Sequence, residues 1–151
     1  MAITYKVKVE GRIYESEKSD FALPGKETME FRYDPTKPFE VQLHIEGDNL
    51  WTFSRDLLAE AVEGVPAGLG DVRVFPTEQD IHITLDPGKS YHATLVFPLD
   101  KVAWFLKGTF RRVPRGKEHI DPARYDKFSI MCIEHQFVNS EAVWQKLAEG
   151  I

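Results

Sequence analysis

The sequence predicts one α+β domain, with antiparallel sheets and packed helices, over residues 1–151. Apolar residues alternate with polar ones in several short stretches, a period of two that is typical of strands with one buried face. Two other stretches carry apolar residues at helical spacing instead. Glycine and proline turns separate these stretches, and no linker in the 151 residues is long or polar enough to divide two domains.

Four strands are expected in the first third of the chain, the last two forming a hairpin around Gly47-Asp48-Asn49. Their apolar positions are Ile3, Tyr5, Val7 and Val9 in the first, Met29, Phe31 and Tyr33 in the second, Phe39, Val41, Leu43 and Ile45 in the third, and Leu50, Trp51 and Phe53 in the fourth. Charged and polar residues lie between them, so each strand is expected to bury one face.

The period changes to that of a helix at Ser54. This serine is a good N-cap, and Asp56 lies near the positive end of the helix dipole. Gly64 and Pro66 then end the helix. The apolar face consists of Leu57, Leu58, Ala61 and Val62.

The run Gly68-Leu69-Gly70-Asp71 predicts a turn with close approach of the backbone. A phosphate-binding glycine loop follows a strand and opens a helix, whereas this run precedes a strand. Three strands are expected after it, and the last two form a hairpin around a type II turn at Asp86-Pro87-Gly88-Lys89. Their apolar positions are Val72 and Val74, then Ile81, Ile83 and Leu85, then Tyr91, Ala93, Leu95 and Phe97.

A second helix is expected from Pro98, which suits a first helical turn, to Pro114. One face carries Leu99, Val102, Ala103, Leu106 and Phe110. Trp104 lies on the other side, about 140° from Leu99, and Phe105 widens the apolar arc. Such a helix is covered either by another chain or by the C-terminal tail, where Trp144 and Leu147 belong to a helix expected over residues 139–147.

Composition indicates an ordinary globular chain. With 42% hydrophobic and 12% aromatic residues it can bury a core, and its one cysteine, Cys132, permits no intrachain disulfide. The formal net charge of −5 argues against general binding to nucleic acid or anionic membranes. No signal-peptide core or apolar membrane span is visible. We therefore expect a cytoplasmic protein without membrane insertion.

No set of residues predicts catalysis, so we expect neither an enzyme nor a cofactor or metal. His82 and His92 on facing strands are a weak candidate for a divalent metal site, but zinc ligands usually have tighter spacing, which favours two exposed histidines. Cys132 and His135 would be neighbours on a helix, but a buried inert cysteine is favoured.

A basic run covers the second half of the second helix and the residues just after it. Its cations are Lys107, Arg111, Arg112, Arg115 and Lys117, with Glu118 immediately after them. Cations suit the negative end of a helix dipole, so we favour a helix end followed by a solvated loop. The two alternatives are contact with an acidic protein and contact with nucleic-acid phosphates.

Two blocks resemble the signature of the actinobacterial SsgA-like sporulation and cell-division proteins. They are Phe53-Ser54-Arg55-Asp56-Leu57-Leu58-Ala59-Glu60 and Gly68-Leu69-Gly70-Asp71-Val72-Arg73-Val74-Phe75-Pro76. The resemblance runs in order from Met29 to Asp121. It includes Arg32-Tyr33-Asp34 with Pro38-Phe39 and Val41 upstream, and Phe105-Leu106-Lys107 with Thr109 and Val113-Pro114-Arg115-Gly116-Lys117-Glu118-His119 downstream.

The resemblance implies a non-enzymatic cytoplasmic regulator of sporulation-associated septation, whose best-understood relatives recruit the tubulin-like protein FtsZ to future septa. It also implies a homotrimer and a ββββ-α-ββββ-α fold similar to that of the Whirly proteins, with one strand that periodicity does not place. We therefore expect an adaptor for FtsZ or another septal protein. The alternative is a single-stranded nucleic-acid-binding module, which the net charge and the lack of aromatics among the basic residues oppose.

Residues beyond Asp121 depart from the family pattern, so residues 122–151 are expected to be an atypical C-terminal extension. The stretch Phe53–Pro76 is interpreted as scaffold, and binding is expected downstream of it. The candidate partner or interface residues are Trp104, Lys107, Arg111, Arg112, Arg115, Gly116, Lys117 and Glu118.

Overall fold

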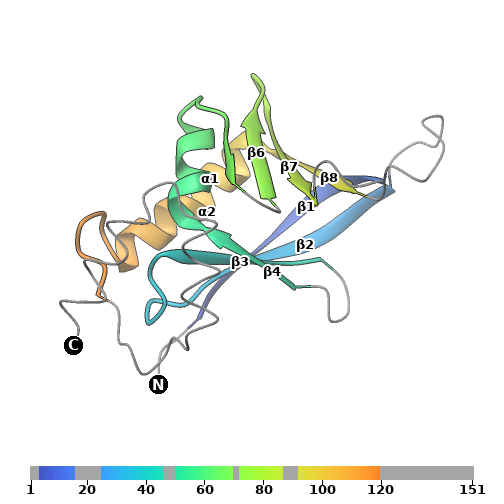
Figure 1. The fold of residues 1–151 in the computed structure, drawn as a ribbon. Helices are drawn as coiled ribbons and strands as arrows, with labels where there is room; N and C mark the ends of the chain where they lie inside the picture. Colours follow the sequence, from blue (N-terminus) through green and yellow to red (C-terminus); the bar gives the residue numbers. More distant parts are fainter. Residues whose placement is uncertain (1–3, 16–24, 46–49, 70–71, 87–91, 120–151) are drawn as a thin grey trace.

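The computed structural model describes residues 4–15, 25–45, 50–69, 72–86 and 92–119 (Figure 1). Within these ranges the chain forms eight strands and two helices in the order ββββ-α-ββββ-α, which confirms the expected α+β class. The first unit contains β1 (Tyr5–Glu15), β2 (Gly25–Tyr33), β3 (Glu40–His44), β4 (Leu50–Ser54) and α1 (Arg55–Val62). The second contains β5 (Ala67–Leu69), β6 (Val72–Pro76), β7 (Asp80–Leu85), β8 (Ala93–Pro98) and α2 (Leu99–Arg112).

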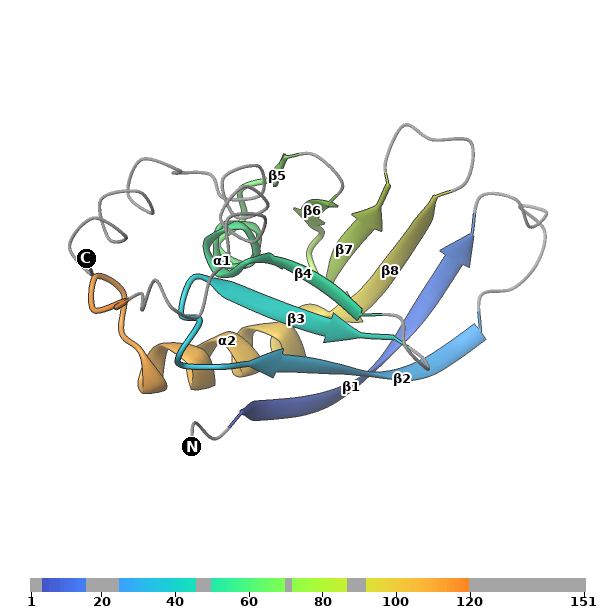
Figure 2. The same cartoon turned by 60° about the horizontal axis from the view of Figure 1, so that its bottom comes forward.

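The described strands form one antiparallel sheet in the order β4-β3-β2-β1-β8-β7-β6-β5. Each unit is a meander, because strands that follow one another in the chain are neighbours in the sheet. The two meanders join only through a short junction. β1 pairs with β2 from Tyr5 to Ile13, but with β8 only from Arg12 to Glu15. The two halves of the sheet diverge from this junction, and both helices lie between them (Figure 2).

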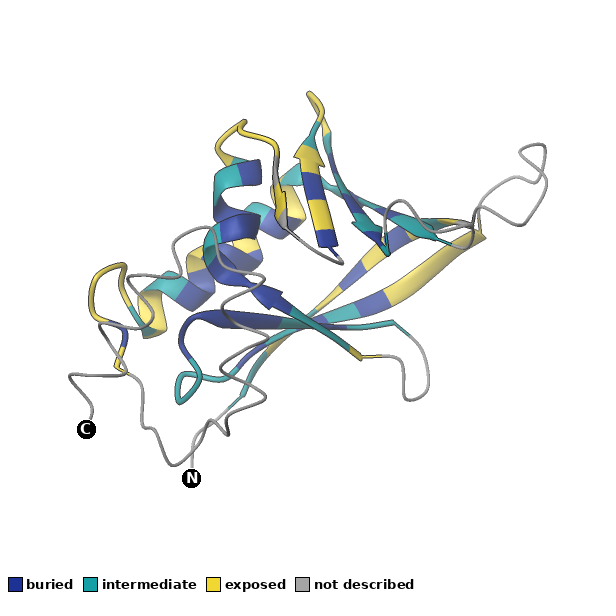
Figure 3. Ribbon diagram, in the orientation of Figure 1, coloured by how far each residue is buried: buried dark blue, intermediate teal, exposed yellow. Residues whose placement is uncertain are grey.

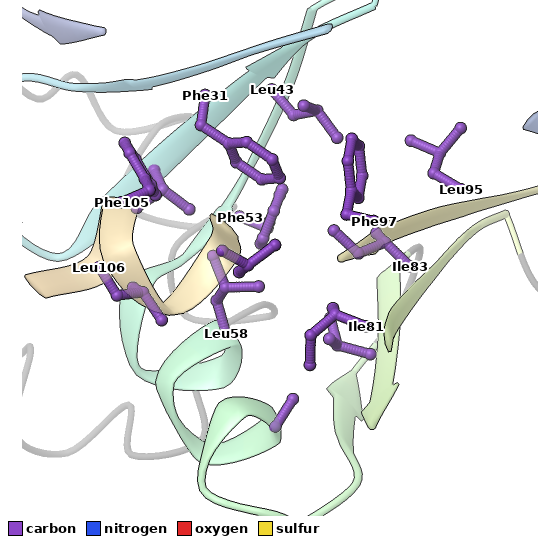
Figure 4. Packing of buried hydrophobic residues seen from close by; sticks show 14 of the residues in the cluster. Phe31, Leu43, Phe53, Leu58, Ile81, Ile83, Leu95, Phe97, Phe105 and Leu106 are labelled. Atoms are coloured by element: carbon purple, nitrogen blue, oxygen red, sulfur yellow. The ribbon is translucent and has the colours of Figure 1, made fainter. Parts of the chain in front are cut away.

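The core lies between the sheet and the helices, and alternate strand positions supply it (Figure 3). In β6, for example, Val72 and Val74 are buried while Arg73 and Phe75 are exposed. Phe31 of β2, Phe97 of β8 and Phe105 of α2 meet at the centre (Figure 4), with ring centroids 4.9 Å apart for Phe31–Phe97 and 5.2 Å apart for Phe31–Phe105. Each such aromatic pair adds roughly 0.5–1.5 kcal/mol beyond simple burial. These ring contacts thus add to the backbone pairing that joins the two halves of the sheet.

The predicted boundaries of both helices are confirmed. The Leu57 amide donates to Ser54 Oγ at 3.1 Å, so Ser54 is the N-cap of α1. Gly64 follows α1 with φ of +103°, a backbone conformation that glycine adopts without strain. Pro98 occupies the N-cap of α2, which ends at Arg112, two residues before Pro114. Short-range signals were sufficient here because capping and helix termination are local.

The turn predicted over Gly68-Leu69-Gly70-Asp71 was wrong for its first two residues, which belong to β5. Gly68 lies in the middle of β5 and pairs with Arg73 of β6. The expected close backbone approach is nonetheless present, because a Cβ on Gly68 would lie 2.8 Å from the Arg73 Cα. Three residues centred on a glycine show no apolar alternation, so periodicity missed this strand. Gly70 and Asp71 lie outside the described residues.

The first strand is longer than the sequence predicted. β1 continues through Gly11 to Glu15, although Gly11 interrupts the apolar alternation after Val9. Gly11 stands where an inward side chain is expected, and a Cβ there would lie 2.7 Å from the Phe97 ring. The large ring therefore fills the space of the missing side chain. The expected positions Ile3 and Tyr91, most of the 86–89 turn and the helix over 139–147 lie outside the described residues.

Candidate partner-binding surface

The inner face of α2 packs on the sheet. Val102, Phe105, Leu106 and Thr109 are all buried there. Tyr5 of β1 stacks on Phe105, with 5.6 Å between ring centroids and 2° between ring planes. Its phenol ring also lies directly against Gly108, at the position a Cβ would occupy. The absence of a side chain at this one helical position thus lets α2 approach β1 closely.

The outer face of α2 carries Trp104, which is 59% exposed, as its helical position predicted. Phe105 does not extend this outer surface, because its side chain is entirely in the core. Lys107 and Arg111 follow Trp104 at intervals of three and four residues and are also exposed. Side chains at this spacing share one face of a helix. We call Trp104, Lys107 and Arg111 the α2 stripe. Trp144 and Leu147, the residues considered as an internal cover, lie outside the described residues.

Arg55, the first residue of α1, is a buried cation that the sequence interpretation missed. Its side chain is 1% exposed, and it reaches the far end of α2. The guanidinium donates from Nη1 to the carbonyl oxygens of Thr109, at 3.3 Å, and Val113, at 2.8 Å. These carbonyls belong to the C-terminal end of α2, where the helix dipole favours a positive charge. Arg55 therefore ties the start of one helix to the end of the other.

Glu118 completes this buried site. Its Oε1 accepts from Arg55 Nη2 at 3.0 Å, and its Oε2 accepts from the Gly116 amide at 2.9 Å. Burial lowers the pKa of Arg55, while the nearby Tyr33 and Glu118 oppose that shift. Burial also raises the pKa of Tyr33, whose hydroxyl donates to the Pro38 carbonyl at 3.0 Å. We call Arg55, Glu118 and the α2 carbonyls the Arg55 clamp.

The clamp corrects two features of the sequence interpretation. Glu118 was a candidate partner residue, but it is only 7% exposed and its carboxylate is used inside the protein. Arg55 was treated as part of an inert scaffold, although it holds the loop at Pro114–Glu118 in place. One signal could have identified it: a cation in the first turn of a helix opposes the dipole and needs compensation from elsewhere.

The basic run divides into partnered and available cations. Arg112 lies over the Tyr5 ring, 3.9 Å from its centroid, and donates to the Gly108 carbonyl at 3.0 Å. Arg115 lies 3.5 Å from Asp56 and 3.9 Å from Glu63, although it is half exposed. Lys107, Arg111, Lys117 and Gly116 are exposed. Within the described residues, the cations of the run that lack such partners are thus Lys107 and Arg111 of the α2 stripe and Lys117 of the 114–118 loop.

The weak metal candidate is not supported by the strand register. His82 pairs across the sheet with Val96 rather than with His92, and its ring stacks on Phe75 at 4.6 Å between centroids. Among the described residues, no group of three His, Cys, Asp or Glu side chains could hold a metal ion. Cys132 and His135 lie outside those residues.

No helix in the described part of the chain is long and apolar enough to cross a membrane.

Comparison with known proteins gives a consistent set of matches. A family model described as Streptomyces sporulation and cell division protein, SsgA, matches residues 28–118. A sporulation-specific cell division protein of Frankia casuarinae is 42% identical over 104 residues, which cover 64% of this chain and 68% of that protein. SsgB of Streptomyces coelicolor is 33% identical over 127 residues, covering 79% of this chain and 88% of that protein.

Solved structures agree with these matches. One solved structure comes from work on mutations in SsgB that correlate to longitudinal cell division during sporulation of Streptomyces coelicolor. It has a TM-score of 0.65 and 32% identity, covering 78% of this chain and 93% of that one. An SsgA-like sporulation-specific cell division protein from Thermobifida fusca has the same TM-score at 19% identity, covering 99% of this chain and 97% of that one, and shows the fold alone. The likeness to Whirly proteins and the extension over 122–151 stay predictions.

Proposed function

This chain belongs to the SsgA family of sporulation and cell division proteins, and we propose that it acts in septation as an adaptor that binds another division protein. The family is one of division and sporulation proteins and not a known enzyme family. The partner we propose is FtsZ or another septal protein, met in the cytoplasm at the site of septation. We further propose that the working form is a homotrimer.

The observation that carries the proposal is the exposed α2 stripe. Trp104 is the most exposed large apolar side chain of the described residues, at 59%, and Lys107 and Arg111 follow it on the same helical face. Exposed tryptophan and arginine are the residue types enriched at the energetic centres of protein interfaces. Two cations beside the indole favour an acidic partner surface, since complementary charge speeds and orients association.

The Arg55 clamp supports this use of α2. It fixes the helix C-terminus and the 114–118 loop against α1 through contacts that are almost entirely buried. A rigid surface loses less conformational entropy on binding than a mobile one. The stretch that carries the family signature therefore holds the proposed binding surface in place without forming it.

Co-sedimentation with purified FtsZ polymers, together with two-hybrid assays against a panel of septal proteins, tests the proposal. We expect binding by the wild type and a loss of about tenfold in affinity for Trp104→Ala and for Lys107→Glu. Arg73→Glu is the matched control, because Arg73 is exposed on β6, away from the stripe. Failure of the wild type to bind FtsZ or any panel member would overturn the adaptor function.

Two further measurements address the remaining parts of the proposal. Sedimentation equilibrium of the full chain tests the trimer, and a monomer at all concentrations excludes it. Filter binding to single-stranded DNA across salt tests the nucleic-acid alternative, which requires binding at low salt that weakens as salt rises.

A further inference from the structure

One edge of β1 has no strand partner over half of its length in the described part of the chain. β2 covers one edge from Tyr5 to Ile13, whereas β8 covers the other only from Arg12 to Glu15. β8 ends at Pro98, level with Glu10, and the chain turns into α2. Tyr5–Val9 therefore lies beyond the end of β8, and Glu10 and Gly11 face its last residues without pairing to them. Backbone donors and acceptors along such an edge form a ready template for another extended chain.

A groove of about 710 Å³ runs along the Val7–Gly11 part of this open edge and continues past the paired residues Arg12 and Tyr14. Its β1 lining includes every residue from Val7 to Arg12. Successive side chains of a strand point to opposite faces of the sheet, so six consecutive side chains cannot all line a groove on one face. We infer that these residues line the groove through the backbone edge that they share. Val9 and Gly11 are themselves buried and therefore contribute little beyond backbone.

The walls of the groove come from both faces of the sheet. Lys101 and Trp104 of α2 line one side, and α2 covers the inner face of the sheet. His82 and Val96 line the other side, and they alternate with buried residues, so they lie on the outer face. Residues from the two faces share one groove because β1 and β8 diverge there and leave the edge open between them.

The chemistry of the lining favours an acidic ligand with apolar residues. Four cations line the groove, Lys8, Arg12, Lys26 and Lys101, against two acids, Glu10 and Asp80, and none of the four forms an ion pair with another described residue. This local excess of positive charge contrasts with the formal charge of −5 for the chain. Trp104 and Tyr14, 59% and 46% exposed, supply aromatic surface at the rim.

We propose that this β1–α2 groove binds an extended acidic segment of a partner protein by strand addition to Tyr5–Gly11. The proposal rests on the adaptor function and specifies how one partner segment is held. Backbone hydrogen bonds supply affinity in this mode, and side-chain pockets supply specificity. A second copy of this chain is the less favourable occupant, because its own Tyr5–Gly11 segment carries two lysines and one glutamate and would bring further positive charge to a groove lined by four cations and two acids.

The test uses the full chain and a fluorescein-labelled seven-residue peptide in which aspartate alternates with valine. Seven residues span roughly 23 Å, about the length of the open edge. Two control peptides carry lysine in place of aspartate, or proline at the centre. We expect the acidic peptide alone to raise fluorescence anisotropy and to slow amide hydrogen exchange within Tyr5–Gly11. Equal binding of all three peptides, or protection elsewhere, would overturn the proposal.

Charge reversals inside and outside the groove provide the matched comparison. Lys8→Glu lies in the groove and should weaken peptide binding by about tenfold, whereas Arg73→Glu, at an exposed position of β6 outside the groove, should change it less than about twofold. Equal effects of the two variants would contradict docking in the groove. Exchange protection of Tyr5–Gly11 that rises with protein concentration alone would place a second copy on the edge instead. Neither failure touches the adaptor function, since FtsZ co-sedimentation with the Lys107→Glu variant tests that separately.

Discussion

Replacing Arg55 by methionine should strongly destabilise the fold, because it leaves Glu118 as an unpaired buried carboxylate. The guanidinium is 1% exposed, and it provides bonds to two carbonyl oxygens and one Glu118 oxygen. Removing one partner of a buried ion pair typically costs about 3–5 kcal/mol. That loss is a large part of the roughly 5–15 kcal/mol by which domains are stable.

The clamp also predicts strong coupling between its two charged members. Glu118→Gln keeps an oxygen that can accept from Arg55, so it should cost only about 1–3 kcal/mol. The double variant Arg55→Met with Glu118→Gln no longer buries an unpaired charge. Its loss should therefore be smaller than the sum of the single losses, by about 1–3 kcal/mol.

Urea unfolding followed by tryptophan fluorescence measures these losses in the free energy of unfolding. Arg73→Met, at an exposed position of β6, is the control, and its free energy of unfolding should stay within about 0.5 kcal/mol of that of the wild type. The reasoning would be refuted if Arg55→Met cost less than about 1 kcal/mol, or if the two single losses simply added. Hydrogen exchange adds a local reading, since release of the clamp should speed exchange in the 114–118 loop more than in β6.

Three smaller predictions follow from single buried groups. Ser54→Ala removes the α1 cap and should lower the free energy of unfolding by about 1 kcal/mol in the same urea assay. An unchanged free energy of unfolding would contradict the capping role of Ser54. Burial raises the pKa of Glu40 from 4.5 to about 7. The folded state therefore binds more protons than the unfolded state between these values, and stability should fall as pH rises from about 5 to 7. Glu40→Gln should remove up to about 3 kcal/mol of that fall in the free energy of unfolding. The prediction would be contradicted if wild type and Glu40→Gln lost stability equally between about pH 5 and 7. Gly108→Ala should destabilise by about 1–3 kcal/mol despite better helix propensity, because the added methyl meets Tyr5. Gly25→Ala, with open space around it, is the control in thermal melts, and equal melting shifts would contradict the steric argument.

Much of the fold was predictable because its signals are local. Alternation in β2, β3, β7 and β8 identified buried positions such as Phe31 and Leu95, since a strand exposes alternate side chains to opposite faces. Ser54 and Pro98 marked helix starts through capping chemistry that spans only a few residues. β5 was missed because a three-residue strand around Gly68 carries no periodic signal.

The candidate surface was predictable only in part. Helical geometry alone placed Trp104 opposite the core face, and it is exposed there. Both Arg111 and Arg112 are exposed, but the same geometry does not show that Arg112 lies over the Tyr5 ring of a distant strand. Whether a surface cation is available depends on what the rest of the chain brings beside it.

The sequence by itself determined the family and most of the secondary structure, all but β5 and the second half of β1, because strand alternation, helix caps and the signature blocks are properties of neighbouring residues. Only the tertiary structure decided which charges are buried and which edges are open. Arg55 meets Glu118 across 63 positions of the chain. The open edge of β1 exists because two meanders share a junction from Arg12 to Glu15 and then diverge. Both features arise from pairings between distant segments, whose register no local pattern encodes.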